Sequence, residues 1–238
     1  MEIIGSGTIA CAFEHSKLTE ETCVLFASGV SSSLETRAEQ FYREMNLLDS
    51  VLCSKFDKPI IYFSSCVRSG EHNIPYFRHK RLIERKIYES GKRFNIYRLP
   101  QLASTTSRHT LIGNFTLAVL LQKHMTINQS AERYLLATED LVRIVSIHIK
   151  RRGFNSEMID ISSFFPISPL QVLHQTAHLL KKPIPPHTLI DTPDSILPQF
   201  DRLEKIIEED DPLLSKHYAS ELLATIVPEI AKTAGLGS

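Results

Sequence analysis

Short apolar runs alternate along the first part of the chain with amphipathic stretches. The runs are nearly continuous and rich in β-branched and aromatic residues, which is typical of strands covered on both faces. The predicted strands occupy residues 3–4, 22–27, 58–63 and 94–99. Between them, apolar side chains recur at helical spacing and predict helices over 35–48 and 75–90. This alternation predicts an α/β fold, with a parallel sheet between two layers of helices.

The pattern is less regular beyond residue 103. The expected helices begin near Leu111, Glu139 and Ser168, and the expected strands occupy 133–136 and 158–161. Pro169 suits the first position of the helix that follows Ser168. The proline-rich segment 181–198 has no periodicity and predicts an ordered loop or a linker. The last stretch, 199–233, predicts one helix or a pair of helices.

Charge and hydropathy narrow the class of protein. The chain has 238 residues, and its 27 lysine and arginine residues balance its 27 aspartate and glutamate residues. A net charge of zero argues against a general attraction to nucleic acid or anionic lipid. No stretch approaches the roughly 18 uninterrupted apolar residues of a membrane span. We therefore expect a globular protein that binds no nucleic acid and has no membrane span.

The amino terminus and the cysteines both indicate a cytoplasmic protein. The first residues enter an apolar run without a basic segment or a cleavage site, unlike a secretory signal. The cysteines are Cys11, Cys23, Cys53 and Cys66. They lie far apart and form no CxxC pair, so we expect buried thiols in a reducing compartment, neither disulfides nor a zinc site.

A glycine-rich motif follows the first predicted strand. Residues 5–10 read Gly-Ser-Gly-Thr-Ile-Ala, a GxGxxA pattern that opens a helix. Glycines at such a turn let the backbone approach a pyrophosphate, and the helix amino terminus contributes N–H groups and a partial positive charge. A tight strand-to-helix turn that binds nothing explains the same residues. The surrounding alternation of strands and helices is what favours a dinucleotide site.

A tyrosine and a lysine four residues apart form the second candidate motif. Tyr76 and Lys80 fall in a predicted helix, where residues i and i+4 share a face. A nearby cation favours tyrosinate and lowers a phenol pKa from about 10 toward the working range of a general acid or base. Ser64 and Ser65 end the preceding strand, where a hydroxyl can hold a carbonyl or carbinol oxygen. The alternative is a surface tyrosine beside a solvated lysine, because the spacing also arises by chance.

The order of these motifs resembles the short-chain dehydrogenase/reductase superfamily. The resemblance is carried by the glycine turn, the strand ending in Ala27-Ser28-Gly29, the strand ending in Ser64-Ser65, the Tyr76/Lys80 pair and the strand ending in Leu99-Pro100. It covers about residues 1–185 and is nearest to the extended, NAD-dependent epimerase/dehydratase branch that acts on nucleotide-linked sugars. Unusually short members from polysaccharide biosynthesis look most similar, with stretches such as FASGVS, YFSS and RLPQ.

The resemblance implies a role for each matching residue. Tyr76 is expected to be the catalytic acid/base, and Lys80 its partner, which also holds the nicotinamide ribose. Ser65 is expected to bind the reacting oxygen, with Ser64 as the alternative. The implied cofactor is NAD or NADP, in contact with Gly5, Gly7, Thr8, Ile9, Ala10, Ala27, Ser28, Gly29, Ser64, Lys80 and Pro100. The implied substrate is a nucleotide-linked sugar, in contact with Ser65, Arg108 and His109.

The implied fold is a Rossmann-like parallel sheet from which a piece is missing. Such a fold has a second strand whose terminal acidic residue, about 20 residues after the glycines, binds the adenosine ribose. Here the strand in that place, 22–27, resembles a later strand of the family. A strand, a helix and another strand are therefore expected to be absent between Lys17 and Thr22, and the choice between NAD and NADP stays open. We expect a truncated core over 1–103, a substrate-binding part over 104–198 that is interleaved with the core, and a C-terminal helical segment over 199–238.

The leading interpretation is an NAD(P)-dependent oxidoreductase, either a reductase or an epimerase, in surface polysaccharide synthesis. The missing segment motivates an alternative, a degenerate member that binds a nucleotide sugar or a partner protein without redox chemistry. A regulator that senses the cofactor is a third interpretation, and the resemblance also allows a homodimer. No metal is expected, because His174 and His178 share a helix face without an acidic third ligand.

Overall fold

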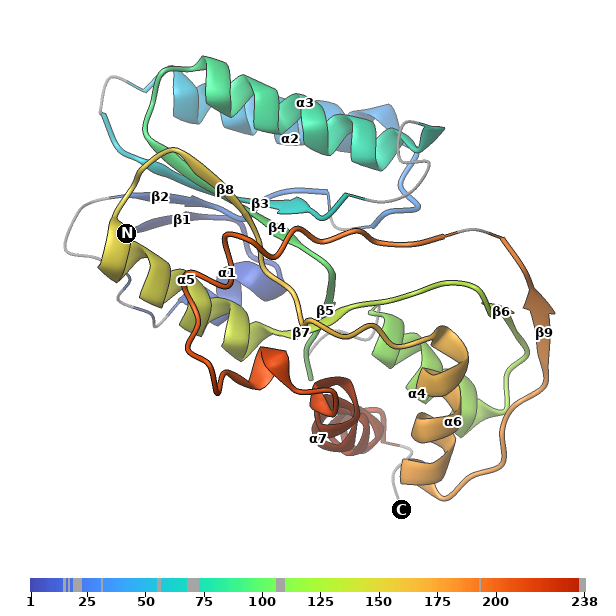
Figure 1. Cartoon of the computed structure of the whole chain (residues 1–238). Helices are drawn as coiled ribbons and strands as arrows, with labels where there is room; N and C mark the ends of the chain where they lie inside the picture. Colours follow the sequence, from blue (N-terminus) through green and yellow to red (C-terminus); the bar gives the residue numbers. More distant parts are fainter. Residues whose placement is uncertain are drawn as a thin grey trace. The chain divides into compact units, whose positions relative to one another are not determined.

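Two units, each drawn from three stretches of the chain, make up the protein (Figure 1). Unit 1 comprises residues 1–99, 139–161 and 199–206, and unit 2 comprises 100–138, 162–198 and 207–238. The structure is a computed structural model. It describes residues 1–14, 16, 18, 23–30, 32–54, 57–67, 73–105, 110–192 and 194–235.

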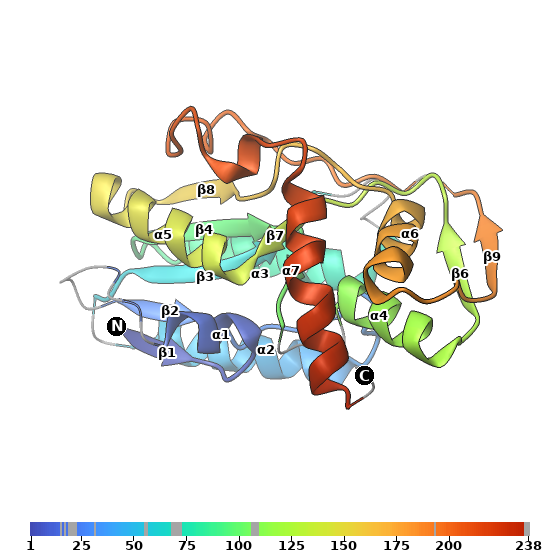
Figure 2. The same cartoon turned by 90° about the horizontal axis from the view of Figure 1, so that it is seen from below.

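Unit 1 is built on a parallel sheet of five strands in the order β1-β2-β3-β4-β8. The strands span Glu2–Ile4, Val24–Phe26, Ile60–Ser65, Phe94–Leu99 and Glu157–Asp160. One face carries α2 (Ala38–Leu52) and α3 (Pro75–Glu89), and the other carries α1 (Thr8–Phe13) and α5 (Thr138–Arg152) (Figures 1 and 2). The predicted α/β fold, with a parallel sheet between two helical layers, is confirmed.

The two faces of this sheet have separate apolar cores. Tyr62 of β3 belongs to the cluster that also contains Leu48 of α2 and Ile83 of α3. The next residue, Phe63, faces the other way, and its ring centroid lies 5.4 Å from that of Phe13 in α1. Successive side chains of β3 therefore alternate between the two helical layers, as the pleat of a strand requires.

The strand β1 forms an edge of the sheet. Within the described residues β1 pairs with β2 alone, in a register that places Glu2 opposite Val24. A full Rossmann sheet continues past its first strand with two more strands. The strand order thus confirms the predicted truncation on this side of the sheet.

Unit 2 combines three helices with two short strand pairs. The helices α4 (Leu111–Leu121), α6 (Pro169–Leu180) and α7 (Tyr218–Thr233) pack on one another around a shared apolar core. Parallel pairs join β5 (Gln101–Ala103) to β7 (Leu135–Ala137) and β6 (Met125–Asn128) to β9 (His187–Ile190). As expected, α6 begins after Ser168, whose side chain accepts from the Gln171 N–H in a capping box.

The prediction of a helix from residue 199 was wrong for 199–217. This segment forms turns and a short 3₁₀ helix, η2 (Pro212–Leu214), before α7 begins. The guanidinium of Arg202 donates to the Met158 carbonyl at 3.0 Å, and that of Arg151 donates to the Ile206 carbonyl at 2.9 Å. These tertiary hydrogen bonds hold the start of the segment in turns and override its helical periodicity.

Two further predictions need correction. The segment 181–198 was predicted to be a loop or linker, but it contains β9, which gains its backbone partners from β6. Of the four cysteines, which are all free, Cys23 and Cys66 are buried as expected, whereas Cys11 and Cys53 are exposed. Cys53 is the C-terminal cap of α2. Among the described residues, no helix is both long and apolar enough to cross a bilayer.

Candidate active site

The predicted tyrosine and lysine lie on α3, whose rotation is fixed by its apolar side. Pro75 occupies the first turn of α3, and Ile83 and Ile87 are fully buried against the sheet. This rotation turns Lys80 inward, where it is 3% exposed, and leaves Tyr76 half-buried. The sequence of α3 therefore places a cation in the interior and a phenol at the boundary with solvent.

Tyr76 and Lys80 lie close together on α3. The Nζ atom of Lys80 is 5.7 Å from the centroid of the Tyr76 ring. The Tyr76 ring also meets Phe77 edge-on, with 5.1 Å between the ring centroids. An ammonium group at this distance from an aromatic ring is attracted by the quadrupole of the ring.

Lys80 also belongs to a buried polar network around Glu44 of α2. Its Nζ donates to Oε1 of Glu44 at 3.0 Å and to the hydroxyl of Tyr62 at 3.1 Å. The Tyr62 hydroxyl donates to the same Oε1 at 2.9 Å. The other carboxylate oxygen, Oε2, accepts from the Val30 backbone N–H at 2.8 Å and from Nε2 of His79 at 3.0 Å. Two helices, the strand β3 and the loop after β2 thus meet at one carboxylate.

Glu44 is ionised although its side chain is fully buried. Burial alone would raise the pKa of this carboxyl group, because a charge is costly in a medium of low dielectric. The hydrogen bond from His79, the charge of Lys80 and the Val30 N–H oppose burial and hold the pKa at about 2. Burial and the neighbouring carboxylate raise the pKa of Tyr62 well above its usual value, so its hydroxyl stays protonated and can donate.

Gly29 leaves the space that Lys80 and Glu44 fill. A Cβ atom on Gly29 would lie 2.6 Å from Nζ of Lys80 and 2.9 Å from Oε1 of Glu44. Both distances are shorter than real contacts of a Cβ atom. In this structure the absence of a side chain at the end of β2 admits the ion pair.

The two serines at the end of β3 point to opposite faces of the sheet. Because side chains alternate along a strand, Ser64 shares the face of Tyr62 and Ser65 shares the face of Phe63. Ser64 is 5% exposed, and its Oγ has no hydrogen-bond partner among the described residues. Ser64 is therefore the serine on the side of Lys80, with an unused buried hydroxyl.

Charged side chains of α3 also hold the backbone at the end of β3. Nη2 of Arg81 donates to the Ser65 carbonyl at 2.5 Å, while Arg81 forms an ion pair with Glu84. Arg98 of β4 forms a two-pronged pair with the same carboxylate, at 2.9 and 2.7 Å. Such paired hydrogen bonds fix the orientation of the two groups and also strengthen the attraction between them. The helix α3 thus carries both the candidate acid/base, Tyr76, and Arg81, whose hydrogen bond holds the end of β3.

The glycine motif forms a tight turn against the end of β2. Gly5 has a φ of +132°, and a Cβ atom there would lie 2.4 Å from the Ala27 carbonyl oxygen. The close approach to Ala27 is by itself sufficient reason for glycine at this position. Gly7, by contrast, has nothing within 4 Å of where its Cβ would be. Thr8, Ile9 and Ala10 form the first turns of α1, and Ala10 is buried.

The remaining predicted contacts fall elsewhere. Pro100 belongs to unit 2, directly after β4. Arg108 and His109 lie outside the described residues. Ser28, next to Gly29, is held by Arg43 of α2, whose guanidinium donates to the Ser28 hydroxyl and carbonyl, both at 3.3 Å.

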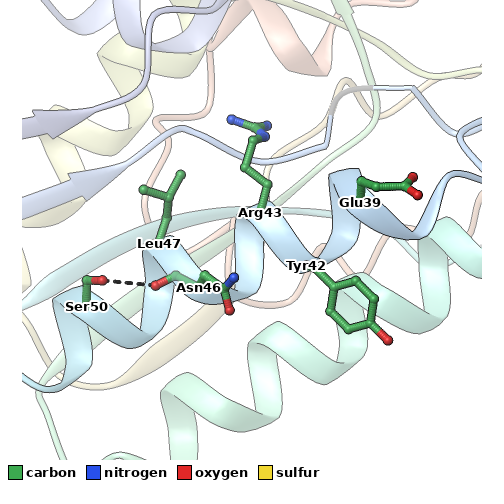
Figure 3. Close-up of a pocket in the computed structure, with 6 residues that line it drawn as sticks. All are labelled: Glu39, Tyr42, Arg43, Asn46, Leu47 and Ser50. Carbon is green, nitrogen blue, oxygen red and sulfur yellow. Dashed lines mark hydrogen bonds between the residues drawn. The ribbon is translucent and has the colours of Figure 1, made fainter.

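A shallow hollow lies along one side of α2, and Figure 3 shows the six side chains that line it. They are Glu39, Tyr42, Arg43, Asn46, Leu47 and Ser50. None of the predicted site residues is among the six that line the hollow, and Arg43 connects it to Ser28, just after β2. It is a surface feature of α2, and the candidate site is defined instead by the buried network on the opposite side of this helix.

Sequence reasoning missed Glu44, Tyr62 and His79. One signal was available: Glu44 stands on the apolar stripe of α2, three residues after Phe41 and four before Leu48. A charge at such a position needs a buried partner, because an unpaired buried carboxylate is costly. The identity of the partner depends on how α2 packs on α3, which the spacing does not reveal. Among the described residues, no cluster of His, Cys, Asp or Glu could hold a metal ion.

Comparison with solved structures identifies the fold. The chain resembles a UDP-N-acetylglucosamine 4-epimerase from Methanobrevibacter ruminantium with a TM-score of 0.70 and 14% identity, covering 93% of this chain and 82% of that one. RMD from Pseudomonas aeruginosa, complexed with NADPH, gives 0.67 and 12% identity over 88% and 81%. The Bordetella bronchiseptica enzyme WbmH, in complex with NAD+, gives 0.67 and 16% identity over 90% and 76%. No model of a protein family and no curated protein matches the sequence. The chain thus has the Rossmann-like fold that the resemblance implied.

Proposed function

We propose that the protein is an NAD(P)-dependent oxidoreductase, a reductase or an epimerase, that acts on a nucleotide-linked sugar in surface polysaccharide synthesis. The observation that carries the proposal is the placement of Lys80 beside Tyr76 on α3, a helix whose Arg81 also holds the Ser65 carbonyl at the end of β3. Structures of similar fold include UDP-sugar epimerases and proteins in complex with NAD+ or NADPH, which supports this class of substrate and cofactor.

The residues present fit the nicotinamide end of the cofactor. Lys80 has three N–H donors, of which Glu44 and Tyr62 take two, so one can reach a ribose hydroxyl. Gly7 has open space around it, as a backbone that approaches a pyrophosphate requires. The bound cofactor would supply the hydride donor or acceptor. No acidic residue stands at the end of β1 or of β2, where it could bind the adenosine ribose. The proposal therefore leaves the cofactor as either NAD or NADP.

Proton transfer in this proposal belongs to Tyr76. Its phenol is half-buried, so it can meet a sugar hydroxyl, and the ammonium of Lys80 lies beside its ring. A serine at the end of β3 holds the same sugar oxygen. Ser65 matches the motif of the family, but we favour Ser64, whose buried Oγ has no partner in the described part of the chain and lies on the face of Lys80. Arg108 and His109 are proposed substrate contacts.

The first test is a fluorescence titration with NADH and with NADPH, followed by turnover of a panel of UDP-linked sugars. We expect Tyr76→Phe to lower kcat by at least about a hundredfold, because general acid–base catalysis contributes about 10²–10⁴-fold. The matched control is Tyr88→Phe, at an exposed tyrosine of the same helix. Wild-type protein that binds neither cofactor and turns over none of these sugars would contradict the proposal.

A binding module without redox chemistry is the second candidate function. The observation that favours it is the edge position of β1, which removes the segment where adenosine binds in a full Rossmann fold. If Tyr76→Phe left polysaccharide assembly intact, with binding of UDP-sugars retained, this module would replace the enzyme.

The proposal extends to a cytoplasmic homodimer. Exposed apolar side chains occur on the two helices of one layer, with Tyr42 of α2 and Tyr88 of α3 being 68% and 65% exposed. Light scattering of the purified chain measures its mass in solution and decides between monomer and dimer.

A further inference from the structure

We propose that Glu44 is the positioning residue for Lys80, holding its ammonium group beside Tyr76 during proton transfer. This inference rests on the proposed function and adds to it a residue of α2, a helix outside the tyrosine–lysine motif. It is carried by the 3.0 Å contact between Nζ and Oε1 and by the complete burial of the carboxylate.

The carboxylate of Glu44 is a fixed acceptor. Its two oxygens offer about four lone-pair sites. Four donors occupy them: Lys80, Tyr62, His79 and the Val30 N–H. Glu44 therefore has no free site with which to bind a ligand, and any effect on the reaction passes through the groups that it holds.

Lys80 is constrained by two of its three donors. An ammonium nitrogen is tetrahedral, so once two N–H bonds point at Oε1 of Glu44 and at the Tyr62 hydroxyl, the direction of the third is set. The distance from Nζ to the Tyr76 ring, 5.7 Å, is set by the same anchors. A lysine without these anchors would have several rotamers and no fixed distance to the phenol.

Stability alone does not account for the ion pair. A buried pair can often be replaced by apolar residues of similar volume without loss of stability, because desolvation offsets the attraction. Position 44 lies on the apolar stripe of α2 beside Leu48, where an apolar side chain would suit the core. Gly29 also leaves space for this pair. The arrangement is thus built around charge at Lys80, which is the property that proton transfer at Tyr76 uses.

The test compares Glu44→Gln with Glu39→Gln, an exposed acidic residue of the same helix. The assay follows turnover of the UDP-sugar that the wild type converts fastest, with kcat and the KM for the cofactor measured separately. We expect kcat to fall about a hundredfold in Glu44→Gln, as for a catalytic group displaced by about 1 Å. The KM for the cofactor should rise less than about tenfold, because one hydrogen bond is at stake. Glu39→Gln should match the wild type.

Folding is measured independently, by the urea midpoints of Glu44→Gln, Lys80→Met and the double variant. The double variant removes both charges, so we expect its midpoint to recover toward the wild type while its activity stays lost. If Glu44→Gln does not fold, Tyr62→Phe takes its place, because it removes only one anchor of Lys80. An about tenfold lower kcat is then expected.

The possible results separate the two proposals. Wild-type protein that neither binds cofactor nor turns over sugar overturns the proposed function, and the positioning role falls with it. The positioning role alone is overturned if the wild type is active and Glu44→Gln has the same kcat as Glu39→Gln. The same holds for Tyr62→Phe where it takes the place of Glu44→Gln. A rise in the KM for the cofactor with unchanged kcat also overturns it, since Glu44 would then serve binding and not proton transfer.

Discussion

Lys80 has almost no contact with water, which is unusual for a lysine. Burial of an ammonium group is costly unless a carboxylate and further hydrogen bonds replace the lost hydration. Glu44 and Tyr62 supply these partners, and Gly29 leaves room for them. At the scale of single residues, the candidate site therefore depends on a glycine as much as on its charged groups.

This dependence predicts the effect of Gly29→Ala. The new methyl group would meet Nζ of Lys80 and Oε1 of Glu44, so the ion pair has to shift. We expect the free energy of unfolding to fall by about 1–3 kcal/mol, as for overpacking of a core. Gly7→Ala is the control for stability, because nothing lies within 4 Å of its Cβ position and its φ is −83°. Equal urea midpoints for the two variants would contradict the prediction.

Residue spacing predicted part of the site and missed part of it. The four-residue spacing of Tyr76 and Lys80 was sufficient to place them on one side of α3, because helix geometry is local. The pairing of Lys80 with Glu44 joins residues 36 apart, and it depends on the packing of α2 against α3. Spacing also did not separate Ser64 from Ser65, because only the register of β3 against the helices shows which face each side chain takes.

At the scale of elements, α5 is tied to the sheet by a buried hydrogen-bonded chain. The hydroxyl of Tyr97 in β4 lies 2.8 Å from Nδ1 of His148, and Nε2 of His148 lies 2.8 Å from a carboxylate oxygen of Glu157 in β8. Because a carboxylate only accepts, Nε2 carries the proton and Nδ1 accepts from Tyr97. The neutral ring thus connects one helix to two strands.

This chain predicts a pH-dependent stability. Burial lowers the pKa of His148, the charge of Arg152 acts in the same direction, and the hydrogen bond to Glu157 opposes both. The unfolded chain, with a histidine pKa of about 6.5, therefore binds a proton before the folded chain does. We expect urea midpoints to fall as the pH drops from about 7 to about 5, above the range in which Glu44 titrates.

The variant that checks this prediction is His148→Gln, which has no titratable ring. Its urea midpoint should change less with pH than that of the wild type over the same range. His174→Gln, at an exposed histidine of α6, serves as the control and should keep the wild-type slope. Equal slopes for His148→Gln and the wild type would assign the pH dependence to other groups.

Whether an element can be predicted depends on its length and on whether its backbone hydrogen bonds are local or come from a distant segment. The helix α3 and the strand β4 have long periodic or apolar sequences, and their bounds were predicted almost to the residue. The strands β5 and β6 have three and four residues, too few for a pattern, and each exists because of a partner strand. Residues 199–206 have helical spacing but form turns, which are held by hydrogen bonds to Arg151 and Met158.

At the scale of the whole molecule, the sheet of unit 1, over the residues that the structure describes, ends at β1, where a full Rossmann sheet continues. The family resemblance indicated this, because the strand after the glycines, 22–27, resembles a later strand of the family. The strand order places β2 directly beside β1 and agrees with that expectation. What spacing could not reveal is where the chain passes from one unit to the other, since these boundaries depend on contacts between distant segments.

The truncation predicts how fragments of the cofactor compete. At the ends of β1 and β2, the protein lacks the acidic residue that usually binds the adenosine ribose of the cofactor. Most of the binding energy should therefore come from contacts with the nicotinamide half of the cofactor. We expect reduced nicotinamide mononucleotide to displace NADH with a Kd within about tenfold of that of NADH. AMP should compete much more weakly. Displacement titrations by fluorescence measure both, and stronger competition by AMP would place the main contacts at the other end.

Among the strands that the structure describes, β1 is an edge strand, and this has a consequence for how the protein behaves at high concentration. An edge strand presents unpaired N–H and C=O groups, onto which a strand of another molecule can add. Here the edge is only three residues long, and its first residue, Glu2, forms a salt bridge with Lys58 at 2.9 Å. Short length and charge are the means by which natural sheets resist such association. The shortened sheet thus carries its own protection against aggregation at the side where strands are missing.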